Sequence, residues 1–476
     1  MSLYVSTRDV SATQHSYNDV LLQGLAPDKG LYVPVDYPQI DYQALASLVG
    51  KPYVEIFRYV KGLFLGDEIS TGEQATLAQN AFSADKFPDA GNGNLTPVSE
   101  IDDDFFIQQL SLGPTAAFKD MALQPLGQDM QYVLAKRGES LVLLGATSGD
   151  TGSAAEAAVK GLKNLSLFML SPEIGMSDFQ KAQMGMLSGG NIFNISIPGR
   201  FDDCQDIVKA IKQDEEFSKL GAVNSINWGR IASQVPYYVA GYLQVVGTEV
   251  GKPIDFVVPT GNFGNVLAGY IAKQMGVPIR RLIVATNENS VVDTLIQTGS
   301  YDKPASAKIT TSPSMDITVA SNYERLLYDV VGRSPEKVRA YMDQFEKTGK
   351  VGFKDVGLAD SVLRTRGFDS GVSTASDRLE SIQWAQWQSG IVIDPHTADA
   401  VTVARTKKED GVPIVCMSTA LPVKFEPTIR EALGFVPARQ ERFQGIEEKS
   451  LGGFTVLPND AEAIKAFIRS NSGSQG

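Results

Sequence analysis

The run Ser111-Leu-Gly-Pro-Thr-Ala-Ala-Phe-Lys-Asp120 most constrains how this chain can fold. Its glycine and proline, Gly113-Pro114, end the segment that comes before. Apolar residues then recur at helical spacing up to a closing Gly138: Leu123, Leu126, Met130 and Val133. The run therefore predicts a turn that delivers one lysine, Lys119, to the start of a helix.

A lysine in that position has altered chemistry. The backbone dipole at a helix start disfavours a positive charge, so the Lys119 ammonium is expected to lose its proton more readily. A neutral amine can form an imine with an aldehyde. The alternative is an ordinary solvated lysine, and this run by itself does not decide between the two.

Length and charge limit the classes of partner. The chain has 476 residues, which is too long for one compact core and predicts two or three domains. Its apolar fraction of 43% and charged fraction of 21% are those of a soluble globular protein. The net charge of -12 speaks against nucleic acid and acidic membrane surfaces as partners. Any anionic substrate must therefore be bound by a local group of basic residues.

Rare residue types narrow the setting further. The two cysteines, Cys204 and Cys416, form no disulfide framework and predict a cytoplasmic, reducing compartment. The first nine residues lack the apolar core of a signal peptide, and no run of about 18 apolar residues predicts a membrane span. The two histidines, His15 and His396, do not combine with cysteine at metal-ligand spacing, so we expect no metal site.

From about residue 100, short apolar strands alternate with helical stretches, which predicts parallel α/β sheets. Residues 300–385 are more polar and read as a helical insertion, and the tail from Ser470 reads as disordered. The predicted strands are Leu141–Leu144, Leu165–Leu170, Asn194–Ile197, Ala222–Ile226, Phe256–Val258, Leu282–Ala285 and Ile414–Met417.

Two loops rich in glycine and hydroxyl or amide residues each join a predicted strand to a helix. They are Gly145-Ala-Thr-Ser-Gly-Asp-Thr-Gly152 and Pro259-Thr-Gly-Asn-Phe-Gly-Asn265. Such loops present backbone N–H groups to an anion at a helix start. In the second loop, Gly261 and Gly264 allow positive φ and a close backbone approach. A plain turn with helix-capping residues is the alternative for both loops.

The lysine run and the two loops, in this order, resemble the pyridoxal-phosphate enzymes of the tryptophan synthase β type, and within them the threonine synthases. Three further segments resemble the longer bacterial and fungal branch of that family. They are Leu22-Gln-Gly-Leu-Ala-Pro-Asp-Lys-Gly-Leu-Tyr-Val-Pro34, Ser171-Pro-Glu-Ile-Gly-Met-Ser-Asp-Phe-Gln-Lys-Ala-Gln183 and Met417-Ser-Thr-Ala-Leu-Pro-Val-Lys-Phe425. The resemblance extends over essentially the whole chain.

The resemblance implies an α/β architecture of fold-type II. Two α/β domains would hold pyridoxal 5'-phosphate between them, with an N-terminal domain added. We expect the N-terminal domain over residues 1–95. The large domain would comprise 96–134 and 222–430, with its insertion at about 300–385, and the small domain 135–221. Residues 431–476 would form a C-terminal segment with a disordered tail.

The resemblance also assigns roles to residues around the cofactor. Lys119 would hold pyridoxal phosphate covalently through its amine and, once released by the substrate amine, act as the catalytic base. The cofactor phosphate would bind to the loop formed by Gly261, Asn262, Phe263, Gly264 and Asn265. Thr419 would face the ring nitrogen, although Ser418 is adjacent and only one of the two can point that way.

Asp150 stands where the wider family often has asparagine, and a carboxylate cannot donate a hydrogen bond as an amide does. Its expected contact with the cofactor oxygen therefore competes with a role as a helix cap. Ser148, Gly149 and Thr151 would bind the substrate carboxylate.

The substrate phosphate needs basic or amide groups, and the candidates are Asn227, Arg230, Lys181 and Lys424. Arg230 offers the fork geometry that suits phosphate. A solvated charge is the alternative for each lysine, and a structural histidine is the preferred interpretation of His396.

The activity implied by the family is the conversion of O-phospho-L-homoserine and water to L-threonine and phosphate. The product distinguishes it from a related dehydratase or phospholyase, which would release a keto acid and ammonia. A non-catalytic protein that binds phosphorylated ligands is a remote alternative, against which Lys119 argues. We expect a small-molecule substrate, no nucleic-acid or membrane partner, and a monomer or small homo-oligomer.

Overall fold

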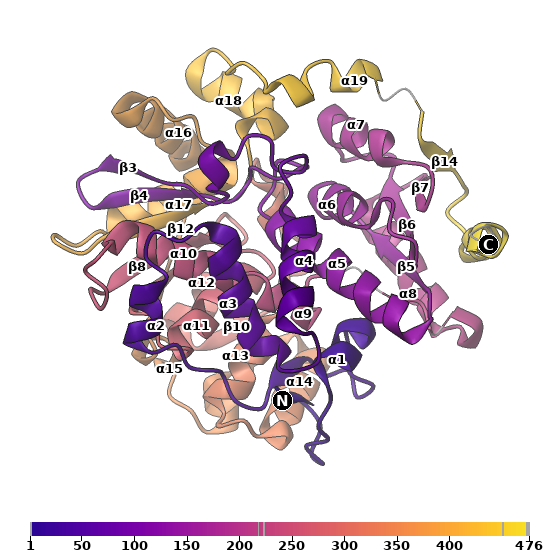
Figure 1. Ribbon diagram of the computed structural model, residues 1–476, viewed down its shortest axis with the longest axis horizontal. Coiled ribbons are helices and arrows are strands. Elements are labelled where there is room, and N and C mark those ends of the chain that lie inside the picture. Colours follow the sequence, from indigo (N-terminus) through magenta and orange to yellow (C-terminus); the bar gives the residue numbers. More distant parts are fainter. Residues whose placement is uncertain (1, 218, 222–223, 450–451, 473–476) are drawn as a thin grey trace. The chain divides into compact units, whose positions relative to one another are not determined.

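The computed structural model describes residues 2–217, 219–221, 224–449 and 452–472. Its chain divides into two compact units, drawn in Figure 1. The first unit comprises Met1–Gln79, Phe87–Leu112 and Ser225–Pro437, and the second comprises Asn80–Lys86, Gly113–Asn224 and Ala438–Gly476. No helix of the described residues is both long enough and apolar enough to cross a membrane.

A six-stranded sheet forms the centre of the first unit. Five neighbouring strands run parallel, and the last pairs antiparallel at the edge. The order is β12 (Phe368–Val372), β9 (Ile279–Thr286), β8 (Ile254–Pro259), β13 (Ile414–Ser418), β4 (Phe105–Gln109) and β3 (Val98–Asp102). Because β8 and β13 are parallel neighbours, the loops after their carboxyl ends emerge at the same edge of the sheet.

Three helices pack on one face of this sheet and bury a continuous apolar cluster. They are α16 (Ala375–Ser389), α17 (Pro395–Lys407) and α18 (Glu426–Leu433). The cluster includes Val257 of β8, Ile283 of β9, Cys416 of β13 and Val401 of α17, all fully or almost fully buried. Parallel strands covered in this way consist of nearly continuous apolar residues, which explains why their sequences were recognisable.

The remaining elements of the first unit include its N-terminal part, where β1 pairs antiparallel with β2. These are β1 (Tyr4–Ser6), α1 (Tyr17–Gln23), β2 (Tyr32–Pro34), α2 (Tyr42–Ser47), α3 (Tyr53–Leu65), α9 (Trp228–Ala232), α10 (Val235–Val246), α11 (Gly264–Gln274), α12 (Val291–Thr298), β10 (Ser300–Asp302), α13 (Tyr323–Val330), α14 (Pro335–Thr348), β11 (Lys350–Gly352) and α15 (Val362–Thr365), with 3-10 turns at Gly91–Gly93, Pro313–Met315, Phe353–Val356 and Pro422–Phe425. Helix α4 (Thr71–Ala81) ends where the chain leaves this unit.

The second unit has a four-stranded, fully parallel sheet. Its order is β14 (Phe454–Val456), β7 (Ile192–Ile197), β6 (Leu165–Pro172) and β5 (Leu141–Ala146), and the last three lie side by side in Figure 1. The helices are α5 (Asp120–Arg137), α6 (Asp150–Val159), α7 (Asp178–Leu187), α8 (Phe201–Gln213), α19 (Ile446–Lys449) and α20 (Ala461–Ser472), with 3-10 turns at Glu215–Phe217 and Glu441–Phe443.

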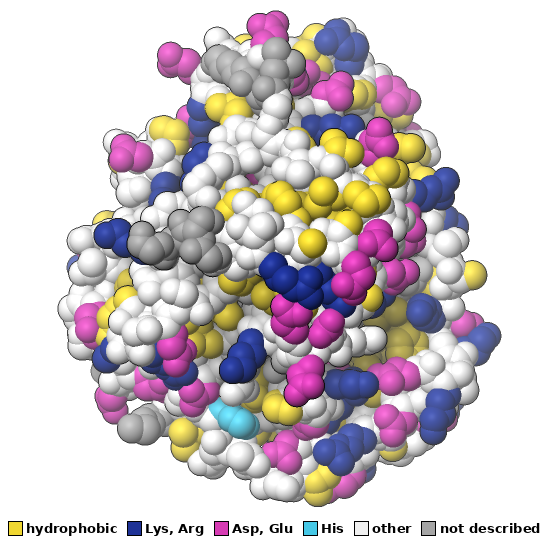
Figure 2. All heavy atoms as spheres, turned by 90° about the vertical axis from the view of Figure 1, so that its right-hand side faces the viewer, with side chains coloured by type: hydrophobic (Ala, Val, Ile, Leu, Met, Phe, Trp, Pro, Cys, Tyr) yellow, Lys and Arg dark blue, Asp and Glu magenta, His cyan; other side chains and the backbone are white. Residues whose placement is uncertain are grey.

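Alternate residues of these strands supply the core of the second unit. Phe168 and Leu170 of β6 pack with Ile195 of β7 in a cluster that also includes residues of α8 and α20. Phe193 stacks on Phe168 with ring centroids 4.5 Å apart. On the face shown in Figure 2, acidic and basic side chains are interspersed. Arg469 of α20 forms an ion pair with Glu216 at 2.7 Å.

The sequence-based strand predictions hold at six of seven positions, with the strands one to four residues longer than expected. The exception is Ala222–Ile226. Its residues 222–223 lie outside the described residues, and Asn224–Ile226 form a turn before α9 instead of a strand. Strands β3, β4, β12 and β14 of the two larger sheets were not predicted, nor were the strands of the two small sheets, β1, β2, β10 and β11.

Two regional predictions change. The range 300–385 is largely helical as expected, but its residues Phe368–Val372 form an edge strand of the large sheet. Ser470–Ser472, expected to be disordered, complete helix α20, where Ser470 Oγ bonds to the carbonyl of Ala466. Residues 473–476 of the expected tail lie outside the described residues. The domain limits themselves stay a prediction.

Candidate active site

Lys119 lies directly before helix α5, as the sequence predicted. The turn that carries it is held by Asp120, whose carboxylate accepts bonds from the backbone N and the hydroxyl of Thr115, both at 2.8 Å. A side chain at Gly113 would collide with Asp120, because an added Cβ would lie 2.5 Å from its Cβ. Arg442 donates to the Gly113 carbonyl at 2.8 Å, a contact that no sequence pattern indicated.

The ammonium of Lys119 faces a carboxylate in the same unit. Its Nζ lies 3.8 Å from Asp150 Oδ2, with the lysine side chain 13% and the aspartate side chain 5% exposed. Asp150 Oδ1 accepts a 3.0 Å bond from Gln180 Nε2. Gln180 is itself held by Ser177 in the capping box of α7. The carboxylate is therefore bound by a second helix and placed beside the amine.

The loop around Asp150 satisfies much of its own hydrogen-bonding potential. Thr147 Oγ1 accepts from the backbone N of Gly149 at 3.0 Å and of Gly152 at 2.8 Å. Gly149 has φ +140°, and an added Cβ would meet Gln180 at 2.4 Å. Ser148 is exposed and Thr151 half-buried. Of the three predicted carboxylate-binding residues, Gly149 thus has its N–H engaged within the loop.

The first unit holds the other loop, at the start of α11. An added Cβ at Gly261 would lie 2.8 Å from the carbonyl oxygen of Ser314, so only glycine fits. The positive φ that the sequence assigned to the glycines is found at Phe263 instead, at +66°. The buried Phe263 ring stacks on Phe368, which directs the side chain into the core and leaves its backbone at the loop.

Asn262 and Asn265 differ in their surroundings. Asn262 is exposed, and its carbonyl accepts from Asn322. Asn265 is buried, and its Oδ1 accepts from the hydroxyls of Tyr237 and Tyr238 at 2.7 and 2.8 Å. Its Nδ2 is buried with no hydrogen-bond partner among the described residues. A buried, unused donor at a helix start suits the phosphate of a cofactor.

Ser418 is the last residue of β13, the strand next to β8, and Thr419 follows it. Ser418 Oγ and the backbone N of Thr419 both bond to Thr397 Oγ1 at 3.3 Å. No hydrogen bond of the Thr419 hydroxyl is found within the described residues. Ser418 is thus engaged with α17, which favours Thr419 as the residue facing a ring nitrogen.

Helix α9 carries a buried cation of the first unit, Arg230. Arg230 is 5% exposed, and its Nη1 is buried without a hydrogen-bond partner among the described residues. Burial lowers the pKa of its guanidinium to about 10. A buried charge without a partner is costly, so this geometry points to an anionic ligand.

Two of the other candidates for the substrate phosphate, Asn227 and Lys181, already form hydrogen bonds within the protein, and the third, Lys424, is buried. Asn227 caps α9 through Oδ1 and donates from Nδ2 to the Leu21 carbonyl at 2.9 Å. Lys181 donates to the Glu173 carbonyl at 3.1 Å. Lys424 is buried in the 3-10 turn Pro422–Phe425. Their substrate roles stay predictions.

His396 packs as a structural histidine at the start of α17. Its Nδ1 lies 2.7 Å from Asp394 Oδ2, and its Nε2 accepts from the backbone N of Ser314 at 3.0 Å. Ser314 is the residue whose carbonyl closes on Gly261. Through Ser314, the histidine therefore supports the loop Gly261–Asn265.

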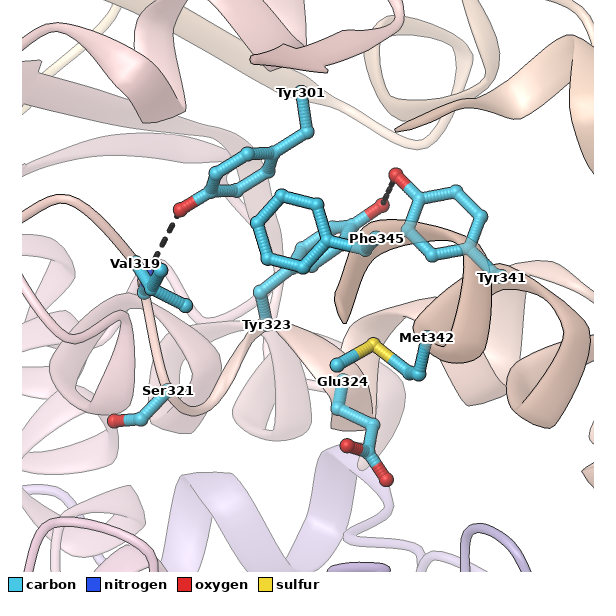
Figure 3. Close-up of a pocket in the computed structure, with 9 residues that line it drawn as sticks. Tyr301, Val319, Ser321, Tyr323, Glu324, Tyr341, Met342 and Phe345 are labelled. Carbon is cyan, nitrogen blue, oxygen red and sulfur yellow. Dashed lines mark hydrogen bonds between the residues drawn. The ribbon is translucent and has the colours of Figure 1, made fainter. Parts of the chain in front are cut away.

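A cavity of about 80 Å³ lies in another part of the first unit. Figure 3 shows its lining of aromatic side chains, with the hydroxyls of Tyr323 and Tyr341 3.2 Å apart. Tyr301 accepts from the backbone N of Ala320 at 2.8 Å. The predicted site residues are absent from its lining, but Ser321 in its wall lies beside Asn322 and bonds to Asn262.

Comparison with known proteins defines first a class and then a family. Residues 92–351 match the model described as pyridoxal-phosphate dependent enzyme. Residues 3–82 match threonine synthase N terminus, and residues 397–468 match threonine synthase, C-terminal. The fold and the site thus define a pyridoxal-phosphate enzyme. The chain belongs to the threonine synthase family.

Individual relatives agree over the full length. The threonine synthase of Corynebacterium glutamicum is 45% identical over 475 residues, covering 98% of each chain. That of Methylobacillus glycogenes is 45% identical, covering 98% of this chain and 99% of its own. The crystal structure of pyridoxal-phosphate-bound threonine synthase from Brucella melitensis superposes with a TM-score of 0.93 at 38% identity, covering 100% of both chains. The expected α/β fold class is confirmed.

Proposed function

We propose that this protein converts O-phospho-L-homoserine and water to L-threonine and phosphate, with pyridoxal 5'-phosphate as its cofactor. The observation that carries the proposal is the buried Arg230, whose Nη1 has no hydrogen-bond partner among the residues that the structure describes. The cofactor phosphate already has a suitable loop at Gly261–Asn265. A buried cation in addition to that loop is best explained by a second anion, which is the phosphate of the substrate.

The residues present fit the cofactor. The free donor of Asn265 and the start of α11 suit its phosphate, and Lys119 supplies an amine for its aldehyde. Thr419 offers a neutral hydroxyl, which leaves a ring nitrogen less protonated than an aspartate would. When bound, pyridoxal phosphate supplies an electron sink that makes the Cα–H of an amino acid acidic.

The chain's own groups divide the remaining work. The Lys119 amine takes and returns protons at neighbouring carbons of the substrate, with Asp150 3.8 Å away to stabilise its ammonium form. Arg230 binds the phosphate that departs from Cγ and stabilises its growing charge. Water then adds its hydroxyl at Cβ. Ser148, Gly149 and Thr151 orient the substrate carboxylate, and Asn227, Lys181 and Lys424 are secondary candidates for the substrate phosphate.

Compartment and assembly are finer points of the same proposal. We place the protein in the cytoplasm as a monomer or small homo-oligomer, without nucleic-acid or membrane partners. Both cysteines, Cys204 and Cys416, are free and buried, which agrees with a reducing compartment. Burial raises the pKa of the Cys204 thiol to about 12, which disfavours the reactive thiolate. Light scattering of the purified protein measures its assembly.

The test is incubation of the purified protein with O-phosphohomoserine while threonine and phosphate are measured together. Equal amounts of both support the proposal. Phosphate with a keto acid and ammonia would instead identify a phospholyase. A protein that binds the substrate without releasing phosphate would be the non-catalytic alternative.

A further inference from the structure

A fully buried arginine, Arg325 of α13, joins three separate segments of the first unit. Its Nε donates to the Tyr32 carbonyl at 2.8 Å, its Nη2 to the Ile226 carbonyl at 2.6 Å and its Nη1 to Asn322 Oδ1 at 2.6 Å. The side chain is 0% exposed, and its guanidinium lies 5.7 Å from the centre of the Trp228 ring. A planar fork can reach three acceptors in three directions, whereas a lysine cannot hold them all in this way.

Asn322 extends these contacts to the two phosphate-binding segments. Its Nδ2 donates to the Ser225 carbonyl at 2.9 Å and to the Asn262 carbonyl at 3.2 Å. Its backbone N donates to the same Asn262 carbonyl at 3.1 Å. Asn322 is also 0% exposed. One amide therefore joins the cofactor loop to the segment 224–230 that ends in Arg230.

Ser321 adds a second link between the same segments. Its hydroxyl lies 2.9 Å from the Ser225 hydroxyl and 3.4 Å from Asn262 Oδ1. On the other side of this stretch, Glu324 accepts from Arg8 at 2.8 Å and from Thr7 at 2.5 Å. N-terminal residues thus hold the first turn of α13, directly after the two residues, Ser321 and Asn322, that bond to the loops.

We propose that Asn322 and Arg325 are positioning residues that set the cofactor-phosphate loop and the Arg230 segment at a fixed separation. The proposal rests on the function proposed above, and it also gives the N-terminal part of the chain a role in the site. Tyr32, in β2, supplies one of the three acceptors that orient Arg325. Arg325 in turn orients the Asn322 amide toward both segments.

The charge of Arg325 adds to this role. Its guanidinium bonds to two carbonyls and an amide oxygen, and burial lowers its pKa to about 10, so it remains protonated at neutral pH. Arg230 and Arg325 are thus two of the buried arginines of the first unit, and Asn322 bonds to the segments that carry both. Both favour anions in the loops that they adjoin.

The main test variant is Asn322→Asp. Its retained oxygen still accepts from Arg325, but a carboxylate oxygen replaces the donor that faces the Ser225 and Asn262 carbonyls. We expect about tenfold weaker binding of pyridoxal phosphate to the apoprotein, with binding of pyridoxal, which lacks the phosphate, changed less than about twofold. We also expect the KM for O-phosphohomoserine to rise about tenfold, with a smaller change in kcat.

Two further variants keep the test decisive if Asn322→Asp does not fold. Arg325→Lys retains the charge without the fork and should show the same selective loss of pyridoxal phosphate over pyridoxal. Ser321→Ala removes a half-buried hydroxyl and should give a loss of about threefold in the same direction.

The matched control is Arg333→Lys. Arg333 also joins this helix region to the N-terminal strand, because it bonds to the Pro34 carbonyl at 2.9 Å and to Asp329, but it does not touch Asn322. Its replacement should lower the melting temperature without changing the ratio of the two affinities. Equal losses for pyridoxal phosphate and pyridoxal, or the same ratio in the control, would overturn the proposal. Because these affinities do not depend on turnover, an absence of threonine formation would refute only the proposed function.

Discussion

The two glycine-containing loops follow the same local plan, a strand, a short loop and a helix start, yet their surroundings differ. The loop at Gly261–Asn265 is held by other elements, through Ser314, Asn322 and the hydroxyls of Tyr237 and Tyr238. The loop around Ser148 is held mainly by its own Thr147, with one bond from Gln180 of α7 to the Asp150 carboxylate. In the first loop, support from other elements leaves the Asn265 Nδ2 donor, which has no hydrogen-bond partner within the described ranges, free for a ligand. In the second loop, Thr147 engages the backbone N–H groups of Gly149 and Gly152.

This difference matches the proposed division of labour. A cofactor that stays bound through many turnovers benefits from a loop fixed before binding, because no ordering free energy is lost. A substrate that enters and leaves in every turnover can be served by a more exposed loop. The first loop is therefore expected to be sensitive to small steric changes, and the second to changes in its exposed polar groups.

The largest effect should come from Lys119→Ala, which removes the covalent anchor and leaves the cofactor to the first loop alone. We expect turnover to fall by several orders of magnitude, at least about 10³-fold, while some pyridoxal phosphate remains bound. Borohydride treatment of the unmodified protein should attach the chromophore to the peptide that contains Lys119. Recovery of the label on another lysine would remove the central assignment.

Arg230→Ala should come next. We expect kcat/KM for O-phosphohomoserine to fall by about 100-fold, equivalent to about 2.7 kcal/mol, because the departing phosphate loses its cation. The absorbance spectrum of the bound cofactor should stay nearly unchanged. Binding of a non-phosphorylated amino acid is the control, and an equal loss there would show that Arg230 supports the fold or the carboxylate site.

Two glycine variants compare positions within the first loop. Gly261→Ala places a Cβ 2.8 Å from the Ser314 carbonyl and should weaken pyridoxal phosphate binding about tenfold or more. Gly264→Ala meets nothing closer than 3.4 Å and should change it less than about threefold. Similar losses from both variants would mean that the loop tolerates no side chain at either position. The contact with Ser314 would then not explain the effect, and only the position of the loop at a helix start would remain as the reason.

Ser148→Ala tests the exposed loop. We expect the KM for the substrate to rise about fivefold, the loss of one hydrogen bond, with cofactor affinity unchanged. Titration of the apoprotein with pyridoxal phosphate, alongside steady-state kinetics, measures both quantities. A selective loss of cofactor affinity would reverse the assignment of the two loops.

The smallest effect concerns Glu156 in α6, behind the exposed loop. Burial raises the pKa of this carboxyl well above its ordinary value, so the folded chain keeps a proton that the unfolded chain releases above about pH 4.5. The free energy of unfolding should therefore fall as the pH rises from that value, by at most about 1.4 kcal/mol per pH unit, until the folded carboxyl ionises. Glu156→Gln should flatten this slope in denaturant titrations, and the exposed Glu139→Gln should not.

Much of the candidate site could be predicted from the sequence because its chemistry depends on local order. Contiguous stretches of sequence encode three of its features: Lys119 at a helix start, the strand before Gly261, and the hydroxyl residues Ser418 and Thr419 at the end of β13. Strands buried on both faces could be predicted for the same reason, because each is a contiguous run of apolar residues. The strand predicted at Ala222–Ile226 is absent at Asn224–Ile226, because a short sequence pattern by itself does not report whether a neighbouring strand is there to pair with.

By itself the sequence determined the residues with reactive groups and, through its resemblance to the threonine synthases, the family and the cofactor, since the motifs that carry this resemblance lie in contiguous stretches of the chain. Only the tertiary structure decided which of those groups are already engaged. It showed that Asn227 caps a helix, that Ser418 bonds to Thr397 and that Arg230 Nη1 is buried with no hydrogen-bond partner in the described part of the chain. It also brought Asn322 and Arg325 to the loops. Hydrogen bonds between residues almost 300 positions apart, such as Tyr32 and Arg325, leave no periodic signal in a single sequence because their partners are set by packing.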